Sequence, residues 1–227
     1  KFSKDAGVTL VEILIGIVIS VLMMAAVFTS YNAVNNSYSQ VIDKAKISQT
    51  GRDIIGMLVR DIRIAGFKYF DDVSKAPSDY VPILITKNSG GCDKIQLMYG
   101  DRTKLKTKPV TYSFVTYKVT YECKASKIVN KSGSKISAYA IYKSREKWNG
   151  TAWQQASTSI DDFLYKDELV VDHVQDLIFN PVDEKGKLIN PVPTDLSGSN
   201  KIKVIDIAFS IRSQGEFYRN NKPKTLY

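Results

Sequence analysis

A run of apolar residues near the start of the chain predicts a helix long enough to cross a membrane. Between Val8 and Phe28 nearly every residue is aliphatic, and Glu12 is the single charged one. An α-helix rises ~1.5 Å per residue, so a run of this length matches a hydrocarbon layer of ~30 Å. We therefore expect residues 8–29 to form a membrane-spanning helix.

The helical period continues beyond the apolar run. No proline occurs before Pro77, and Gly66 is a suitable terminator because glycine adopts the left-handed conformation that ends many helices. Residues 30–66 therefore predict an amphipathic continuation of the same helix. Apolar residues recur at steps of three and four at Val34, Tyr38, Val41, Ala45, Ile55, Leu58, Ile62 and Ala65.

After Gly66 the pattern changes to short runs of β-branched and aromatic residues separated by turn residues, which is typical of strands. Between Tyr112 and Tyr121 the aromatic positions change phase once, which predicts a bulge or a bend. Near the C-terminus the alternation from Ile205 to Ile211 predicts a strand with one strongly apolar face. The expected strands are 82–86, 94–99, 110–123, 136–144, 174–179 and 201–212.

A long helix followed by a series of strands predicts an α+β fold, with an antiparallel sheet packed on the helix. We expect four segments: a leader at 1–7, the spanning helix at 8–29, its amphipathic half at 30–66 and a β-rich body at 67–227. Lys1 and Lys4 precede the span, and short basic flanks stay in the cytoplasm. The body is therefore expected outside the inner membrane.

The junction between the leader and the helix carries the most specific pattern. Gly7 ends the basic segment, the apolar helix follows at once, and Glu12 lies five residues further on. Glycine lets the backbone enter a peptidase cleft without a side-chain clash. A carboxylate in the bilayer needs a partner, which a new α-amino group on Val8 of a neighbouring chain would supply after cleavage.

This junction resembles the type IV prepilin family, whose signal has the form G-F-T-L-[VI]-E and stands here as Gly7-Val8-Thr9-Leu10-Val11-Glu12. The resemblance implies the type IV pilin fold, cleavage between Gly7 and Val8 by a membrane peptidase, N-methylation of Val8 and an assembly role for Glu12. It also implies an anchored precursor in the inner membrane that later enters an extracellular filament, with other pilins as partners. Val8 departs from the usual phenylalanine.

A second resemblance concerns the end of the helix. The segment Arg60-Asp61-Ile62-Arg63-Ile64-Ala65-Gly66-Phe67 is similar to the R-D-I-R-x-A-G-[YF] signature of PilW-type minor pilins. J-type pseudopilins of type II secretion share this pattern. Taken by themselves, Arg60 and Arg63 lie three residues apart on one helix face, beside Asp61. Cations suit a helix C-terminus, so we expect these three residues to clamp the helix end to the following loop.

Two cysteines and a cationic segment are the remaining candidates. Cys92 and Cys123 are the only cysteines, and outside the inner membrane such a pair is expected to form a disulfide. The net charge is +9, which suits anionic partners, but no compact run of lysine and arginine stands out, so a lysine-rich solvated surface is the favoured explanation. The expected contacts to DNA or another anion are Lys143, Arg145, Lys147 and Trp148, with Trp153 nearby.

Nothing in the sequence predicts an enzyme, a cofactor or a metal site. His173 is the only histidine and lies in no nucleophile motif, so a packed or surface histidine is expected. The acidic pairs lack the spacing of a calcium loop and are read as solvated loops. These pairs are Asp71-Asp72, Asp161-Asp162 and Asp183-Glu184.

The favoured hypothesis is a PilW-like minor pilin that joins a tip or priming complex and helps to start pilus assembly. The alternatives are a J-type pseudopilin of type II secretion, a tip adhesin or DNA-uptake subunit, and the major pilin itself. All but the adhesin or DNA-uptake subunit are structural, and all of them share the processed helix. The middle of the chain, residues 70–165, matches neither resemblance.

Overall fold

The computed structural model describes residues 9–68, 77–104, 112–127, 137–155 and 164–212. The chain divides into two compact units, Lys1–Ala45 and Lys46–Tyr227. Helix α1, Leu10–Ile64, provides the described part of the first unit except Thr9, and its last turns belong to the second. Leucine, isoleucine, methionine and alanine favour the helix, and no proline interrupts it.

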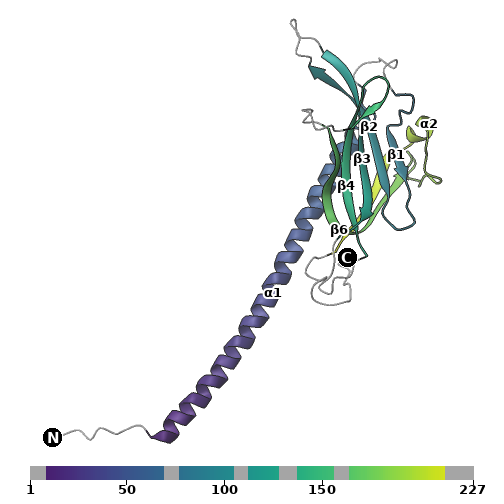
Figure 1. The fold of residues 1–227 in the computed structure, drawn as a ribbon. Coiled ribbons are helices and arrows are strands. Elements are labelled where there is room, and N and C mark those ends of the chain that lie inside the picture. Colours follow the sequence, from purple (N-terminus) through teal and green to yellow (C-terminus); the bar gives the residue numbers. More distant parts are fainter. Residues whose placement is uncertain (1–8, 69–76, 105–111, 128–136, 156–163, 213–227) are drawn as a thin grey trace, which may run out of the picture. The chain divides into compact units, whose positions relative to one another are not determined.

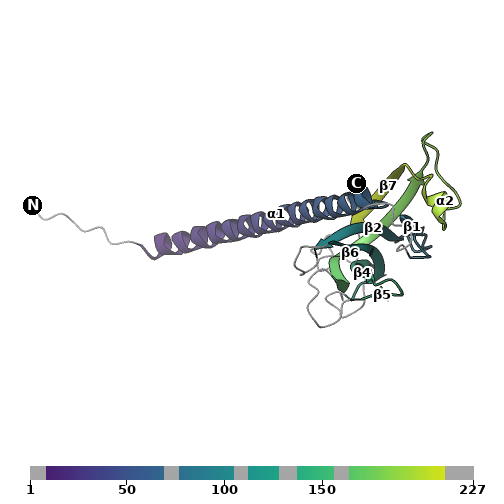
Figure 2. The same ribbon diagram turned by 90° about the horizontal axis from the view of Figure 1, so that it is seen from above.

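The second unit is built on one antiparallel sheet, which confirms the predicted α+β class. Its strand order is β1-β2-β3-β4-β6-β7, with β5 beside β4. The sheet is strongly curved when seen from above (Figure 2). The strands are β1 Ile83–Thr86, β2 Lys94–Lys104, β3 Tyr112–Ala125, β4 Tyr139–Trp148, β5 Trp153–Gln154, β6 Tyr165–Val182 and β7 Val204–Ile211, and a short helix α2, Leu196–Ser199, precedes β7 (Figure 1).

The core lies between the last turns of α1 and the inner face of the sheet. Ile54, Leu58 and Asp61 form the buried stripe of the helix, at steps of four and three residues. The sequence pattern assigned Ile55 to this stripe, but Ile55 is exposed. On the sheet side, burial alternates along β3 from Val115 to Tyr121, as a period of two requires. The sheet residues with no exposed surface are Ile95, Leu97, Tyr121, Ile141, Val174, Leu177 and Phe179.

Of the bulge or bend predicted between Tyr112 and Tyr121, the bulge is absent. Strand β3 pairs with β2 in one continuous register from Tyr112 to Tyr121, and with β4 in another from Tyr117 to Ala125. The aromatic phase changes because Phe114 lies on the opposite face from Tyr117 and Tyr121, not because a residue is inserted. The register shifts of the described sheet lie instead between β4 and β6 and between β6 and β7.

Strand β7 has the predicted apolar face. Ile205, Ile207, Phe209 and Ile211 pack against the core, whereas Val204, Asp206 and Ala208 are exposed. Ile211 also lies near Gly51 of α1, where an added Cβ would meet its Cδ1 atom at 3.9 Å.

Candidate functional site

The described part of the N-terminal region is a capped helix start. The Glu12 N–H donates to Thr9 Oγ1 at 3.3 Å, and Glu12 Oε2 accepts from the Thr9 N–H at 2.8 Å and from the Thr9 hydroxyl at 2.9 Å. These reciprocal bonds form a capping box, which satisfies N–H groups that the first helical turn leaves free. The T-x-x-E spacing signalled this box, but the sequence analysis missed it. Gly7 and Val8 lie outside the described residues.

The first half of α1 presents a continuous apolar surface. Its leucine, isoleucine, valine and methionine side chains between Leu10 and Val27 are all at least half exposed. By length and composition this helix can cross a membrane. The hydroxyls of Ser20 and Thr29 donate to backbone carbonyls of the preceding turn, so these polar groups do not interrupt the apolar surface.

At the other end of α1, Asp61 is the centre of a buried polar cluster. Asp61 is only 4% exposed and Lys143 only 7%. The Lys143 ammonium lies 2.8 Å from Asp61 Oδ2, and the Tyr121 hydroxyl donates to the same oxygen at 2.7 Å. The cluster therefore joins the helix to the two central strands β3 and β4.

Opposing influences act on the charge of Asp61. Burial favours the neutral acid, but the hydrogen bonds from Lys143 and Tyr121 and the charge of Lys143 outweigh it, so the pKa of Asp61 lies below its ordinary value. Burial and the bond to Asp61 raise the pKa of Tyr121, which keeps its proton on the phenol. The pair is therefore an aspartate and a lysine ammonium, held together in the core.

The predicted clamp residues differ in their positions. Asp61 is buried, whereas the Arg60 side chain is 71% exposed and reaches Asp61 Oδ1 at 3.3 Å; Arg63 is exposed. Backbone bonds complete the attachment: the Gly66 N–H donates to the Met98 carbonyl at 2.8 Å, and the Phe67 carbonyl accepts from the Gly100 N–H at 2.7 Å. Gly66 has a φ of +79°, the left-handed conformation expected of a helix terminator.

The cationic segment predicted to contact DNA is the inner face of β4. Lys143, Arg145 and Lys147 alternate along this strand and so share one face. The structure corrects the prediction for Lys143, because its ammonium is buried against Asp61 and does not reach the surface. Trp148 points to the other face, where its ring contacts that of Trp153 with centroids 5.3 Å apart.

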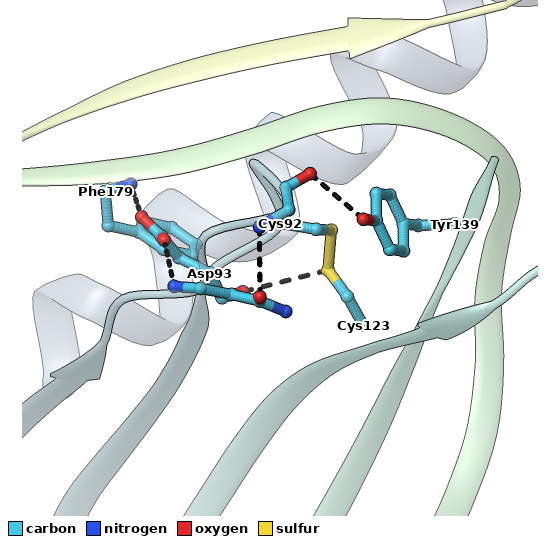
Figure 3. The surroundings of a disulfide bond; sticks show 7 residues. Cys92, Asp93, Cys123, Tyr139 and Phe179 are labelled. Atoms are coloured by element: carbon cyan, nitrogen blue, oxygen red, sulfur yellow. Dashed lines mark hydrogen bonds between the residues drawn. A yellow bond between two sulfur atoms is a disulfide. The ribbon is translucent and has the colours of Figure 1, made fainter. Parts of the chain in front are cut away.

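The disulfide expected from the cysteines is present. Cys92 and Cys123 are bonded, which links the segment before β2 to the end of β3 (Figure 3). Beside the disulfide, the fully buried Asp93 accepts from the Phe179 N–H at 2.9 Å, the Asn88 N–H at 3.1 Å and the Lys87 ammonium at 2.8 Å. The disulfide thus ties the start of β2 to β3, and Asp93 ties it to β6.

Groups suited to catalysis or metal binding are few. In the residues that the structure describes, no three histidine, cysteine, aspartate or glutamate side chains come together as metal ligands. His173 is buried on β6 with a φ of +64°, and burial lowers the pKa of its imidazole. Asp183 accepts from N–H groups of its own turn. Asp71-Asp72 and Asp161-Asp162 lie outside the described residues.

Comparison with known proteins bears on the N-terminal region. Residues 2–28 match the family model described as the prokaryotic N-terminal methylation motif. The chain carries a prepilin-type methylation motif. The matched range contains Gly7, Thr9 and Glu12, and it extends over most of the apolar run. No curated protein and no solved structure matches this chain.

The prepilin motif supports a protein of the pilin or pseudopilin type, which is a structural class. It implies processing by a prepilin peptidase and assembly with other pilins. Together with the apolar helix, it indicates anchoring in the membrane before assembly into a surface filament. The match ends at residue 28, so the type of subunit has to be argued from the rest of the chain.

Proposed function

We propose that this protein is a PilW-type minor pilin that is cleaved between Gly7 and Val8, methylated at Val8, and incorporated into a tip or priming complex that initiates a type IV pilus. The observation that carries the proposal is the methylation motif at the start of a long helix whose apolar side chains are exposed. Such a helix is stable only in a bilayer or against other apolar helices. A protein that is first anchored in the membrane and then assembled into a filament meets both environments in turn.

The geometry at Glu12 suits an assembly contact. Both bonds from Thr9 end on Oε2, and among the described residues no hydrogen bond reaches Oε1. The capping box also holds the carboxylate at the start of the helix, where the helix dipole favours negative charge. A neighbouring subunit's α-amino group at Val8 could therefore pair with a carboxylate that is already oriented. This pairing would set the axial register of the helices.

The PilW-like segment, residues 60–67, supports the proposed subunit type, because several of its residues have a clear structural role in this fold. Asp61 binds the two central strands through Tyr121 and Lys143, and Gly66 ends the helix with a positive φ. Phe67 continues from the helix end to a backbone bond with β2. The segment thus serves as the joint between helix and sheet, which any subunit that transmits packing forces from the filament core requires.

Intact mass and N-terminal sequencing of the membrane-extracted protein, with and without the prepilin peptidase, test the first part of the proposal. We expect a chain that begins at a methylated Val8 only when the peptidase is active. A chain that keeps residues 1–7 in cells with an active peptidase would contradict the assignment.

The minor role is tested by counting subunits. Quantitative mass spectrometry of sheared filaments should find this protein at a small fraction of the repeating subunit, and its deletion should reduce the number of filaments. Abundance equal to that of the main subunit would make it the major pilin. Normal filaments together with lost export of secreted proteins would identify a J-type pseudopilin instead.

Glu12→Gln and Glu12→Val separate the roles of the side chain. Glutamine keeps the capping geometry but removes the charge, whereas valine removes both. If Glu12 pairs with a neighbouring amine, both variants should be processed normally but be depleted from filaments. Depletion by valine alone would show that the helix cap matters and the charge does not.

A further inference from the structure

Arg145 is a cation beside two aromatic rings, and no ion pair among the described residues joins it to a carboxylate. Its guanidinium lies 4.2 Å from the centroid of the Tyr117 ring and 5.8 Å from that of Tyr99. The Nε atom is buried and has no hydrogen-bond partner among the described residues. Tyr99 and Tyr117 are themselves buried, and their ring centroids lie 5.8 Å apart, so the two rings form one aromatic surface beside the guanidinium.

The neighbouring charges are already engaged. Asp61 of α1 faces the same side of β4, but it takes Lys143 at 2.8 Å and Arg60 at 3.3 Å, and no ion pair of the described residues joins it to Arg145. Arginine cannot release its proton, so burial cannot neutralise it as it can a lysine. A partly buried guanidinium without an acceptor is costly, because a buried donor left unsatisfied costs ~1–3 kcal/mol and more when it is charged.

The outer end of the side chain is open. The Nη atoms of Arg145 are not among the buried polar atoms without a partner, and the described hydrogen bonds include none from them. They are therefore accessible to solvent, on a side chain that is only partly exposed. This leaves a planar donor fork that solvent can reach. The Tyr117 ring lies against the guanidinium, and strand β4 fixes the position of the residue.

We propose that Arg145 is a binding site for a single carboxylate, supplied by a neighbouring subunit. A guanidinium fork can bind a carboxylate through two parallel hydrogen bonds. The aromatic rings beside the guanidinium strengthen these bonds by excluding water. A phosphate-rich polymer fits less well, because nucleic-acid binding needs several exposed cations in a row and Lys143 is buried. The site thus takes one negative charge at one fixed place on the inner face of the sheet.

Titration of the full-length protein in neutral detergent micelles with sodium acetate, at constant ionic strength, tests the site. The Arg145 Nε–H resonance, assigned by its loss in Arg145→Lys, should shift and saturate. Arg145→Met should abolish the saturable response, and Arg145→Lys should weaken it at least several-fold because lysine lacks the fork. Lys118→Met is the matched control: Lys118 also lies over an aromatic ring, Trp153 at 4.4 Å, but pairs with Glu146.

A resonance that does not shift with acetate, or that shifts without saturating, would overturn the proposal. A tighter saturable response to phosphate than to acetate would overturn the choice of carboxylate.

A second measurement identifies the source of the carboxylate and rests on the proposed filament role. Arg145→Met should be depleted from sheared filaments relative to Lys118→Met, and depletion supports a neighbouring subunit as the donor. Equal incorporation would overturn that source and leave a soluble carboxylate as the ligand. If the wild-type protein is itself missing from filaments, the proposed function fails while the acetate titration still decides the site.

Discussion

Removing one partner of the buried Asp61–Lys143 pair should destabilise the body far more than removing the pair together. Asp61→Asn keeps the size and the acceptor for Tyr121, but it leaves the Lys143 ammonium buried with no anion within 4 Å among the described ion pairs. Breaking a buried ion pair on one side typically costs ~3–5 kcal/mol, because an uncompensated charge stays in the core. We expect Asp61→Asn and Lys143→Met each to lower the free energy of unfolding within that range.

The double variant should recover much of this loss, because a neutral amide and an apolar side chain leave no buried charge. The coupling energy from the double-mutant cycle should therefore exceed ~2 kcal/mol. Urea unfolding of the full-length protein in detergent micelles, followed by the fluorescence of Trp148 and Trp153, measures it, and urea avoids screening the charges.

The chain supplies a matched control for this cycle. Lys124 and Asp167 lie 2.8 Å apart, as Lys143 and Asp61 do, but their side chains are 41% and 42% exposed against 9% and 6%. Exposed pairs couple by ~0–1 kcal/mol. Equal coupling in the Lys124→Met and Asp167→Asn cycle would refute the argument that burial sets the strength of the pair.

Three further predictions concern the body. The Cys92→Ser and Cys123→Ser double variant should lose ~3–4 kcal/mol, from the loop entropy that the disulfide removes, and a reductant should lower the urea midpoint of the wild type alone. Asp93→Ala should cost ~3 kcal/mol or more, because it leaves two backbone N–H groups without their acceptor and removes the anion that pairs with Lys87, and amide exchange at Phe179 should accelerate. Because the folded pKa of His173 lies below its ordinary value of 6.5, the stability it contributes is present above pH 6.5 and is lost as pH falls from there toward the folded value. His173→Asn, which also tolerates the positive φ, should remove this part of the pH dependence of urea unfolding, and an unchanged pH profile would contradict it.

Several elements could be predicted because their signals are local. The long helix follows from a dense apolar and helix-forming run without proline, and its end follows from one glycine. The apolar face of β7 follows from strict alternation. Strand β6 was predicted only at 174–179, whereas it spans Tyr165–Val182. Its first half is too acidic and irregular to resemble a strand, and pairing with β4 through shifted register stabilises it instead.

The candidate sites also divide into those with a local sequence signal and those that depend on long-range contacts. The motif around Gly7 and Glu12 could be identified from the sequence, because a processing signal and a helix start are both formed by residues close together in the chain. The disulfide could be expected because the chain has only two cysteines. The buried role of Lys143 could not, since a lysine in a β-branched strand has the same local pattern whether it faces solvent or a carboxylate eighty residues earlier.

By itself, then, the sequence determined an anchored helix with a processing signal, a β-rich body and one disulfide, because each depends on residues close together or on a composition with few alternatives. Only the tertiary structure decided that Asp61 turns inward, that Lys143 of β4 meets it there, and that Arg145 lies over the Tyr117 ring with no ion pair among the described residues. These relations depend on the register of β3 and β4 and on the face that α1 presents to them. Long-range packing sets both, so no local pattern encodes which charge finds a partner.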